Sequence, residues 1–255
     1  MQGGAAQRRP RPARAGPRSG PRAAQPQLRR ADGTRSGAPP IPPDIQAKQL
    51  SPEIRSELST LDRGSADVVA RHLVAAGELL DDDPAAALEH ARAARARAGR
   101  IAAVREAVGI AAYRCGDWAQ ALAELRAARR LGSRSALLAM IADCERGLGR
   151  PERALELARS ADAAKLSGDD ADELRIVVAG ARTDLGQLEQ ALTVLSTPRL
   201  EPTRTGATAA RLFYVYAETL LALGRSDEAL QWFLRAASAD VDGVTDAEDR
   251  IYELS

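Results

Sequence analysis

A short motif, Gly-x-x-x-x-Ala-Leu, recurs along the chain and constrains its fold more than any other feature. Its four copies begin at Gly116, Gly149, Gly186 and Gly224. A fifth, degenerate copy spans residues 82–88, and the alanines from Ala87 onward are 34, 33, 37 and 38 residues apart. A repeat of this length is typical of one supersecondary unit stacked on copies of itself. Such arrays offer an extended surface, which favours a binding function over catalysis.

Each copy of the motif joins two helical patterns. Between Ala102 and Gly132, apolar residues recur at helical spacing in two stripes that are interrupted at Gly116. Glycine readily takes the left-handed conformation that ends a helix. Two helices with so short a connection lie roughly antiparallel. The sequence therefore predicts an all-α fold of about five helix pairs, with breaks at the motif glycines. Pro198 predicts that the second helix of the fourth pair ends a turn early.

The repeated unit resembles the tetratricopeptide repeat. The matching residues are Gly109 in a first helix, the alanine pairs Ala121 with Ala128, Ala154 with Ala161 and Ala229 with Ala236, and the aromatic Phe233. Most of the aromatic residues that the family carries in its first helices are absent here. The resemblance covers about residues 68–240. It implies a right-handed superhelical solenoid whose groove, lined by the first helices, binds another protein or peptide.

Composition divides the chain into four parts. Residues 1–43 hold nine arginines against one acidic residue, so their net charge is +8 and that of the remaining chain is −7. This segment also holds nine of the fourteen prolines and few apolar residues, so we expect a disordered tail whose removal leaves the body unchanged. We expect a linker and an N-terminal capping helix at 44–65. The repeat domain should span 66–240, and a C-terminal capping helix 241–255.

No pattern in the sequence indicates an active site. His72 and His90 are the only histidines, and we expect them at the surface or in the groove. Cys115 and Cys144 are too few for a zinc site or a disulfide framework, and are predicted to be small core residues. We therefore expect a non-enzymatic protein without a cofactor or metal. No apolar run resembles a signal peptide or is long enough to span a bilayer, so the predicted location is the cytoplasm.

Two functions remain open at this point. One is a scaffold or adaptor that binds its partner through the groove of the repeats. The other is an RNA- or ribosome-associated factor that is tethered by the arginine-rich tail, without recognition of bases. The predicted groove residues are His72, Glu106, Ile110, Tyr113, Arg114, Asp143, Arg146, Arg211, Tyr214 and Glu218. An alternative interpretation of the three arginines is that they are solvated helix ends. The sequence also leaves open a site on the convex face.

Overall fold

The computed structural model describes residues 37–133 and 136–254, and within these residues the chain is all-helical, without strands. Residues 1–36 of the expected tail at 1–43 lie outside the described residues. The α-helices are α1 (Pro52–Leu58), α2 (Arg63–Glu78), α3 (Pro84–Ala98), α4 (Ala102–Arg114), α5 (Trp118–Arg130), α6 (Leu138–Gly147), α7 (Pro151–Ala158), α8 (Gly168–Asp184), α9 (Leu188–Ser196), α10 (Ala207–Ala222), α11 (Ser226–Ala239) and α12 (Ala247–Leu254). Two short 3-10 helices, η1 (Ala47–Gln49) and η2 (Ala163–Lys165), complete the set.

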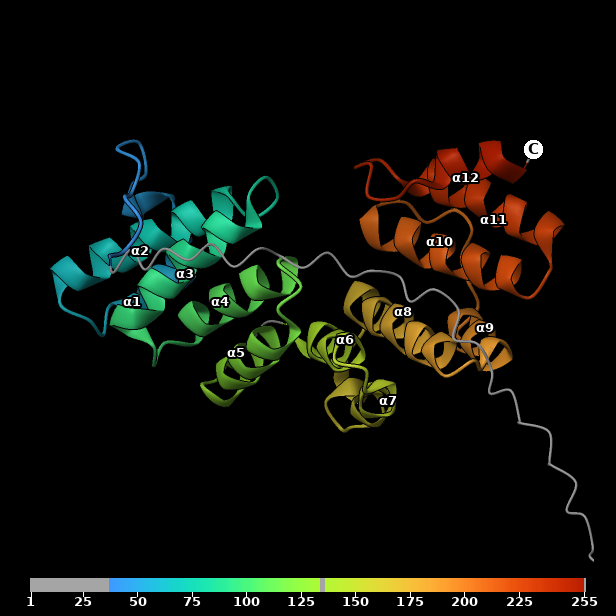
Figure 1. Ribbon diagram of the computed structural model, residues 1–255, viewed down its shortest axis with the longest axis horizontal. Helices are drawn as coiled ribbons and strands as arrows, with labels where there is room; N and C mark the ends of the chain where they lie inside the picture. Colours follow the sequence, from blue (N-terminus) through green and yellow to red (C-terminus); the bar gives the residue numbers. More distant parts are fainter. Residues whose placement is uncertain (1–36, 134–135, 255) are drawn as a thin grey trace, which may run out of the picture. The chain divides into compact units, whose positions relative to one another are not determined.

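Neighbouring helices pack as pairs in chain order. The pairs are α2–α3, α4–α5, α6–α7, α8–α9 and α10–α11, and each also contacts the next along the chain (Figure 1). The all-α prediction and the five packed helix pairs are therefore confirmed. Among the described residues, none of the helices has the length and apolarity that a bilayer crossing requires.

The helix breaks lie at the four predicted glycines. Their φ angles are +71° at Gly116, +72° at Gly149, +72° at Gly186 and +76° at Gly224. At each break, the residue after the glycine donates its N–H to the carbonyl five residues earlier, over 2.9–3.0 Å. This bond satisfies a carbonyl that the helix end leaves free. The backbone of a residue with a Cβ atom would be strained at these φ angles.

Close approach between helices explains the small residues of the repeat. The motif alanines of the second helices are fully buried, at 0% exposure in each of the four motif copies. Gly109 in α4 faces α5, where a Cβ atom would lie 2.6 Å from Cδ2 of Leu125. Phe233 is fully buried in α11. The second helix of the fourth pair, α9, ends before Pro198 as predicted.

The two ends of the body carry short covering helices. Ser51 caps α1, and Leu58 of that helix is buried in the core that α2 and α3 form. At the other end, α12 packs against α11. Residues 37–43 of the expected tail are described, and one of them, Ile41, packs with buried Ile45 against Val74 of α2.

Candidate functional site

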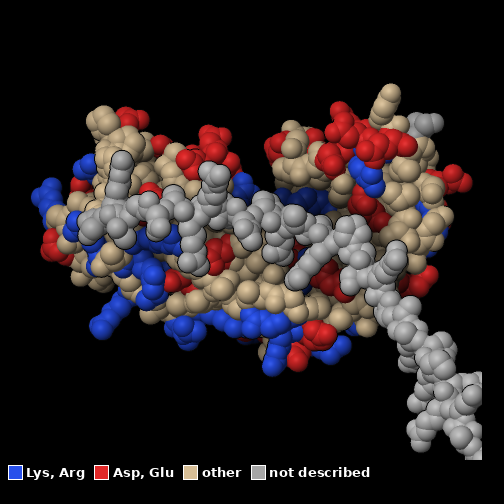
Figure 2. Space-filling view, in the orientation of Figure 1, with Lys and Arg blue, Asp and Glu red and all other residues tan. Residues whose placement is uncertain are grey.

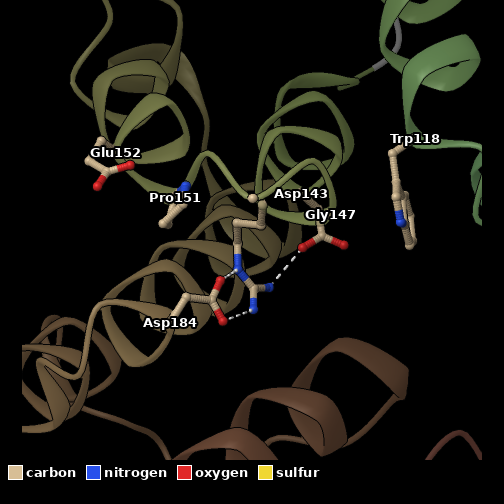
Figure 3. A pocket seen from close by; sticks show the side chains of 8 residues that line it. Trp118, Asp143, Gly147, Pro151, Glu152 and Asp184 are labelled. Carbon is tan, nitrogen blue, oxygen red and sulfur yellow. Dashed lines mark hydrogen bonds and ion pairs between the residues drawn. The ribbon is translucent and has the colours of Figure 1, made fainter. Parts of the chain in front are cut away.

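The predicted groove residues of the middle repeats form one hydrogen-bonded chain across three first helices. The hydroxyl of Tyr113 in α4 donates to Oδ2 of Asp143 in α6, over 2.5 Å. Oδ1 of Asp143 accepts from Arg146, one turn later in α6, over 2.8 Å. Arg146 also makes a two-pronged contact with Asp184 at the end of α8, over 2.8 and 3.2 Å (Figure 3). This series of hydrogen bonds therefore links side chains that lie 71 residues apart in the sequence.

The charges and the burial of these hydrogen-bonded side chains stabilise one arrangement of their donors and acceptors. Burial raises the pKa of Tyr113, and the hydrogen bond to Asp143 raises it further, so the hydroxyl stays a donor. Burial alone lowers the pKa of Arg146, but the bonds and charges of Asp184 and Asp143 outweigh it and raise that pKa. Arg146 is therefore a fixed cation. A two-pronged arginine–carboxylate contact is among the stronger and more directional pairs in proteins.

Two glycines make room for the large side chains at this site. A Cβ atom on Gly180 in α8 would lie 2.4 Å from Cζ of Arg146. A Cβ atom on Gly147 would lie 2.5 Å from Cδ2 of Trp118, which begins α5. The indole ring of Trp118 in turn meets Tyr113 edge to face, with 5.2 Å between ring centroids. Any larger residue at either glycine would displace the aromatic ring or the guanidinium.

A pocket of about 540 Å³ opens beside these hydrogen-bonded side chains. It is lined by Trp118, Asp143, Arg146, Gly147, Gly149, Pro151, Glu152 and Asp184. In Figure 3, Trp118 and Glu152 lie at opposite ends, with Asp143 and Asp184 between them. The lining has three carboxylates and one guanidinium, for a formal charge of −2. The pocket is within the size range of ligand sites and favours a cationic or hydrogen-bond-donating group.

The three predicted groove arginines differ in how firmly they are held. The side chain of Arg146 is 25% exposed, which contradicts the alternative that it is a solvated helix end. Arg114 is 46% exposed and pairs with Asp81 in the preceding repeat. Arg211 is 42% exposed and pairs with Glu173 in the preceding first helix. Each arginine therefore joins neighbouring repeats, but only Arg146 is largely enclosed.

A second pocket, of about 490 Å³, contains two more of the predicted residues. Its lining is Ile176, Arg211, Tyr214, Val215, Gly243, Val244, Thr245 and Asp246. Burial raises the pKa of Tyr214, and a hydrogen bond with Asp246 raises it further. The phenol ring packs edge to face on buried Phe233, with 5.4 Å between centroids. Arg211 and Tyr214 thus share a partly apolar hollow between α8, α10 and the segment before α12.

The remaining predicted groove residues lie outside both pockets. Glu218 of α10 pairs with Arg250 of α12 over 2.7 Å. Glu106 accepts a hydrogen bond from Ser133 over 2.8 Å, and Ile110 is half-buried against the core of the second and third repeats. These residues stabilise contacts within the body, and the structure does not bring them together.

The expectation for the two histidines is wrong. His72 of α2 is 2% exposed and His90 of α3 is 5% exposed, so neither lines a groove or the surface. Their Nδ1 atoms are 3.0 Å apart, which allows one imidazole to donate to the other. Both side chains are buried because α2 and α3 pack against each other, and the two imidazole rings meet between these helices. His72 therefore does not belong to the candidate binding surface.

Metal-ligating clusters and thiols are two further kinds of group that could carry chemistry. No group of three or more metal-ligating side chains is present in residues 37–133 and 136–254. Cys144 is fully buried, and burial raises the pKa of its thiol to about 12. Burial also raises the pKa of the half-buried Cys115. Both thiols are therefore weak nucleophiles at neutral pH.

Comparison with known proteins adds no assignment: no protein-family model matches this sequence, and a search of curated proteins finds no match to it.

Sequence reasoning missed the contribution of α8 to the first pocket. Gly180 lies six residues before the break glycine Gly186, as Asp143 does before Gly149. Asp184 occupies the position two residues before its break glycine. Counting back from the break glycines in every repeat would have found both residues.

Proposed function

We propose that the chain is a non-enzymatic scaffold that binds a peptide segment of a partner protein along the face formed by α4, α6, α8 and α10. The resemblance to tetratricopeptide repeats supports this choice of face, in a right-handed superhelical array. The observation that carries the proposal is the series of hydrogen bonds that runs from Tyr113 through Asp143 and Arg146 to Asp184, beside the first pocket. The protein acts in the cytoplasm in this proposal and needs no cofactor.

The site has the properties that dominate binding energy at protein interfaces. Tyrosine, tryptophan and arginine are enriched among hot-spot residues. Here Tyr113, Trp118 and Arg146 are held by neighbours before any partner arrives, so little conformational entropy is lost on binding. Because the pocket has a formal charge of −2, the partner segment should present a basic side chain there.

Selection of peptides on the purified full-length protein tests this function. Peptides from a display library would be measured by titration calorimetry against the protein and two matched variants. Arg146→Met removes a guanidinium that pairs one turn back with Asp143 over 2.8 Å. Arg153→Met removes one that pairs one turn onward with Glu156 over 2.7 Å and does not line the first pocket. Both variants lose one charge and one ion pair within a helix, and Arg146→Met also loses the contact with Asp184 of α8.

The two variants should respond differently. Loss of the groove guanidinium makes the pocket more negative, but it also frees Asp143 and Asp184 from the positions that Arg146 fixes. We expect this second effect to be larger, so that the selected peptides bind about tenfold or more weakly, as hot-spot truncations cost about 2 kcal/mol or more. The control should stay within about twofold of the parent protein. Equal affinity for both variants, or a library that yields no binder, would contradict the proposal.

A further inference from the structure

Charge is unevenly distributed along the repeats, and its excess lies on one set of helices. Residues 84–166 contain fifteen basic and nine acidic side chains, for a net charge of +6, whereas residues 167–255 contain eight and sixteen, for −8. Ten of the fifteen basic residues are arginines within or next to the second helices α3, α5 and α7. In Figure 2, Lys and Arg side chains gather along the lower edge, where Figure 1 places α5.

The arginines recur at the same place in successive repeats. Arg92, Arg126 and Arg159 each follow the buried alanine of their second helix by five residues. All three are exposed. Ion pairs hold the neighbouring second helices side by side, since Arg95 of α3 contacts Glu124 of α5 over 3.1 Å. Stacking of repeats therefore turns one sequence position into a row of guanidinium groups.

Two buried carboxylates anchor this row without neutralising it. Glu145 is 3% exposed and pairs with both Arg126, over 2.6 Å, and Arg150, over 2.9 Å. Glu124 likewise takes two guanidinium groups, from Arg95 and Arg105. Each cluster keeps a charge of +1. A guanidinium has five donors, so these arginines retain N–H groups for another acceptor.

Arg159 of this row and three further arginines have no partner among the described residues. In the described part of the chain, the side chains of Arg97, Arg100, Arg130 and Arg159 make no ion pair or hydrogen bond, and all four are exposed. They lie at or just beyond the C-terminal ends of α3, α5 and α7. These free cations are not needed for the fold. They are available to an external anion.

The row also contains a hollow that could receive an anionic group. It measures about 480 Å³ and is lined by Arg126, Arg150 and Arg153 together with Glu145, Glu156, Leu157 and Ser160. The three guanidinium groups outnumber the two carboxylates. A phosphate here would meet donors from the second helices of two successive repeats, α5 and α7.

We propose that this arginine row binds the sugar–phosphate backbone of nucleic acid, without reading bases. It is a second surface, distinct from the groove of the first helices. Arginine forks match phosphate oxygens in geometry. Among the described residues of 84–166, the only large apolar side chain that is well exposed is Leu131, at 45%. A protein interface or an inserted membrane contact would require an apolar centre that the row lacks.

Anisotropy of a labelled DNA duplex with the full-length protein tests the proposal. The test variant replaces the four unpartnered arginines by glutamine: Arg97→Gln, Arg100→Gln, Arg130→Gln and Arg159→Gln. The control removes four positive charges elsewhere on the body: Lys48→Gln, Arg199→Gln, Arg225→Gln and Arg235→Gln. Both variants keep residues 1–43, so any contribution of that segment cancels in the comparison. A third variant with lysine at the four test positions keeps the charge.

The salt dependence gives the expected size of the effect. Loss of four phosphate contacts should reduce the slope of log K against log salt by about 3.6, and should weaken binding at about 100 mM salt at least tenfold. The control should stay within about twofold, and the lysine variant should recover most of the affinity. Equal weakening of the test and control variants would overturn the proposal. A preference for anionic lipid vesicles or an acidic peptide over the duplex would overturn it equally. Helicity and melting temperature of each variant verify that it is folded.

Discussion

Acidification should destabilise the first helix pair through the buried histidines. His72 and His90 lie between α2 and α3, with exposures of 2% and 5% and their Nδ1 atoms 3.0 Å apart. One neutral imidazole can donate to the other, but two imidazolium ions cannot share that bond. Protonation inside the pair therefore costs stability, and unfolding relieves the cost.

The magnitude follows from the pKa of His72. That pKa is lowered from 6.5 to about 4, mainly by burial and to a lesser extent by the charges of His90, Arg97 and Arg71. Burial also lowers the pKa of His90, against an opposing effect of Glu89. Since the folded pKa lies below the unfolded one, the stabilising contribution is complete above about pH 6.5 and is lost as the pH falls towards 4. From pH 7 to pH 5, His72 alone should cost about 2 kcal/mol.

Urea denaturation followed by circular dichroism measures this loss. The parent protein and the double variant His72→Leu, His90→Leu would be compared at about pH 7 and about pH 5, because carboxylates titrate mostly below that range. The parent protein should lose about 2 kcal/mol more than the double variant. An identical pH dependence in both proteins would refute the reasoning, since the histidines would then contribute nothing.

Two further predictions concern the core and the N-terminal segment. Leu122→Ala and Phe233→Ala should each lower the free energy of unfolding by roughly 2–5 kcal/mol in urea denaturation, because both side chains are buried. A loss below about 0.5 kcal/mol would mean that these side chains do not face a core. Deletion of residues 1–36 should leave the melting temperature unchanged, whereas deletion of 1–43 should lower it, since Ile41 packs against the body. Equal melting temperatures for the two truncations would contradict that contact.

The helix breaks and helix pairs were predictable because their signals are local. A positive φ at each of the four motif glycines follows the end of a first helix, and the motif alanine comes five residues later in the second helix. The early end of α9 followed from Pro198 alone, since proline cannot continue a helix. These features depend on a few neighbouring residues, so the sequence specifies them directly.

The partners of the polar side chains were not predictable in the same way. Arg146 meets Asp184 across 38 residues, and the contact depends on how α8 stacks on α6 and on the space that Gly180 leaves. The burial of His72 depends on its rotation toward α3. A helical stripe of alanines does not distinguish such a position from one on the groove, because alanine tolerates both.

The affinity of the natural partner for a groove variant tests the central claim most directly. The partner would be recovered by cross-linking in the native cell, identified by mass spectrometry and purified. Titration calorimetry would then compare the protein with the triple variant Tyr113→Ala, Arg146→Ala, Tyr214→Ala, after circular dichroism has verified its helicity. We expect the folded variant to lose at least about a hundredfold in affinity, because these side chains anchor both groove pockets. Full affinity in a well-folded triple variant would contradict the account and place the binding surface elsewhere on the chain.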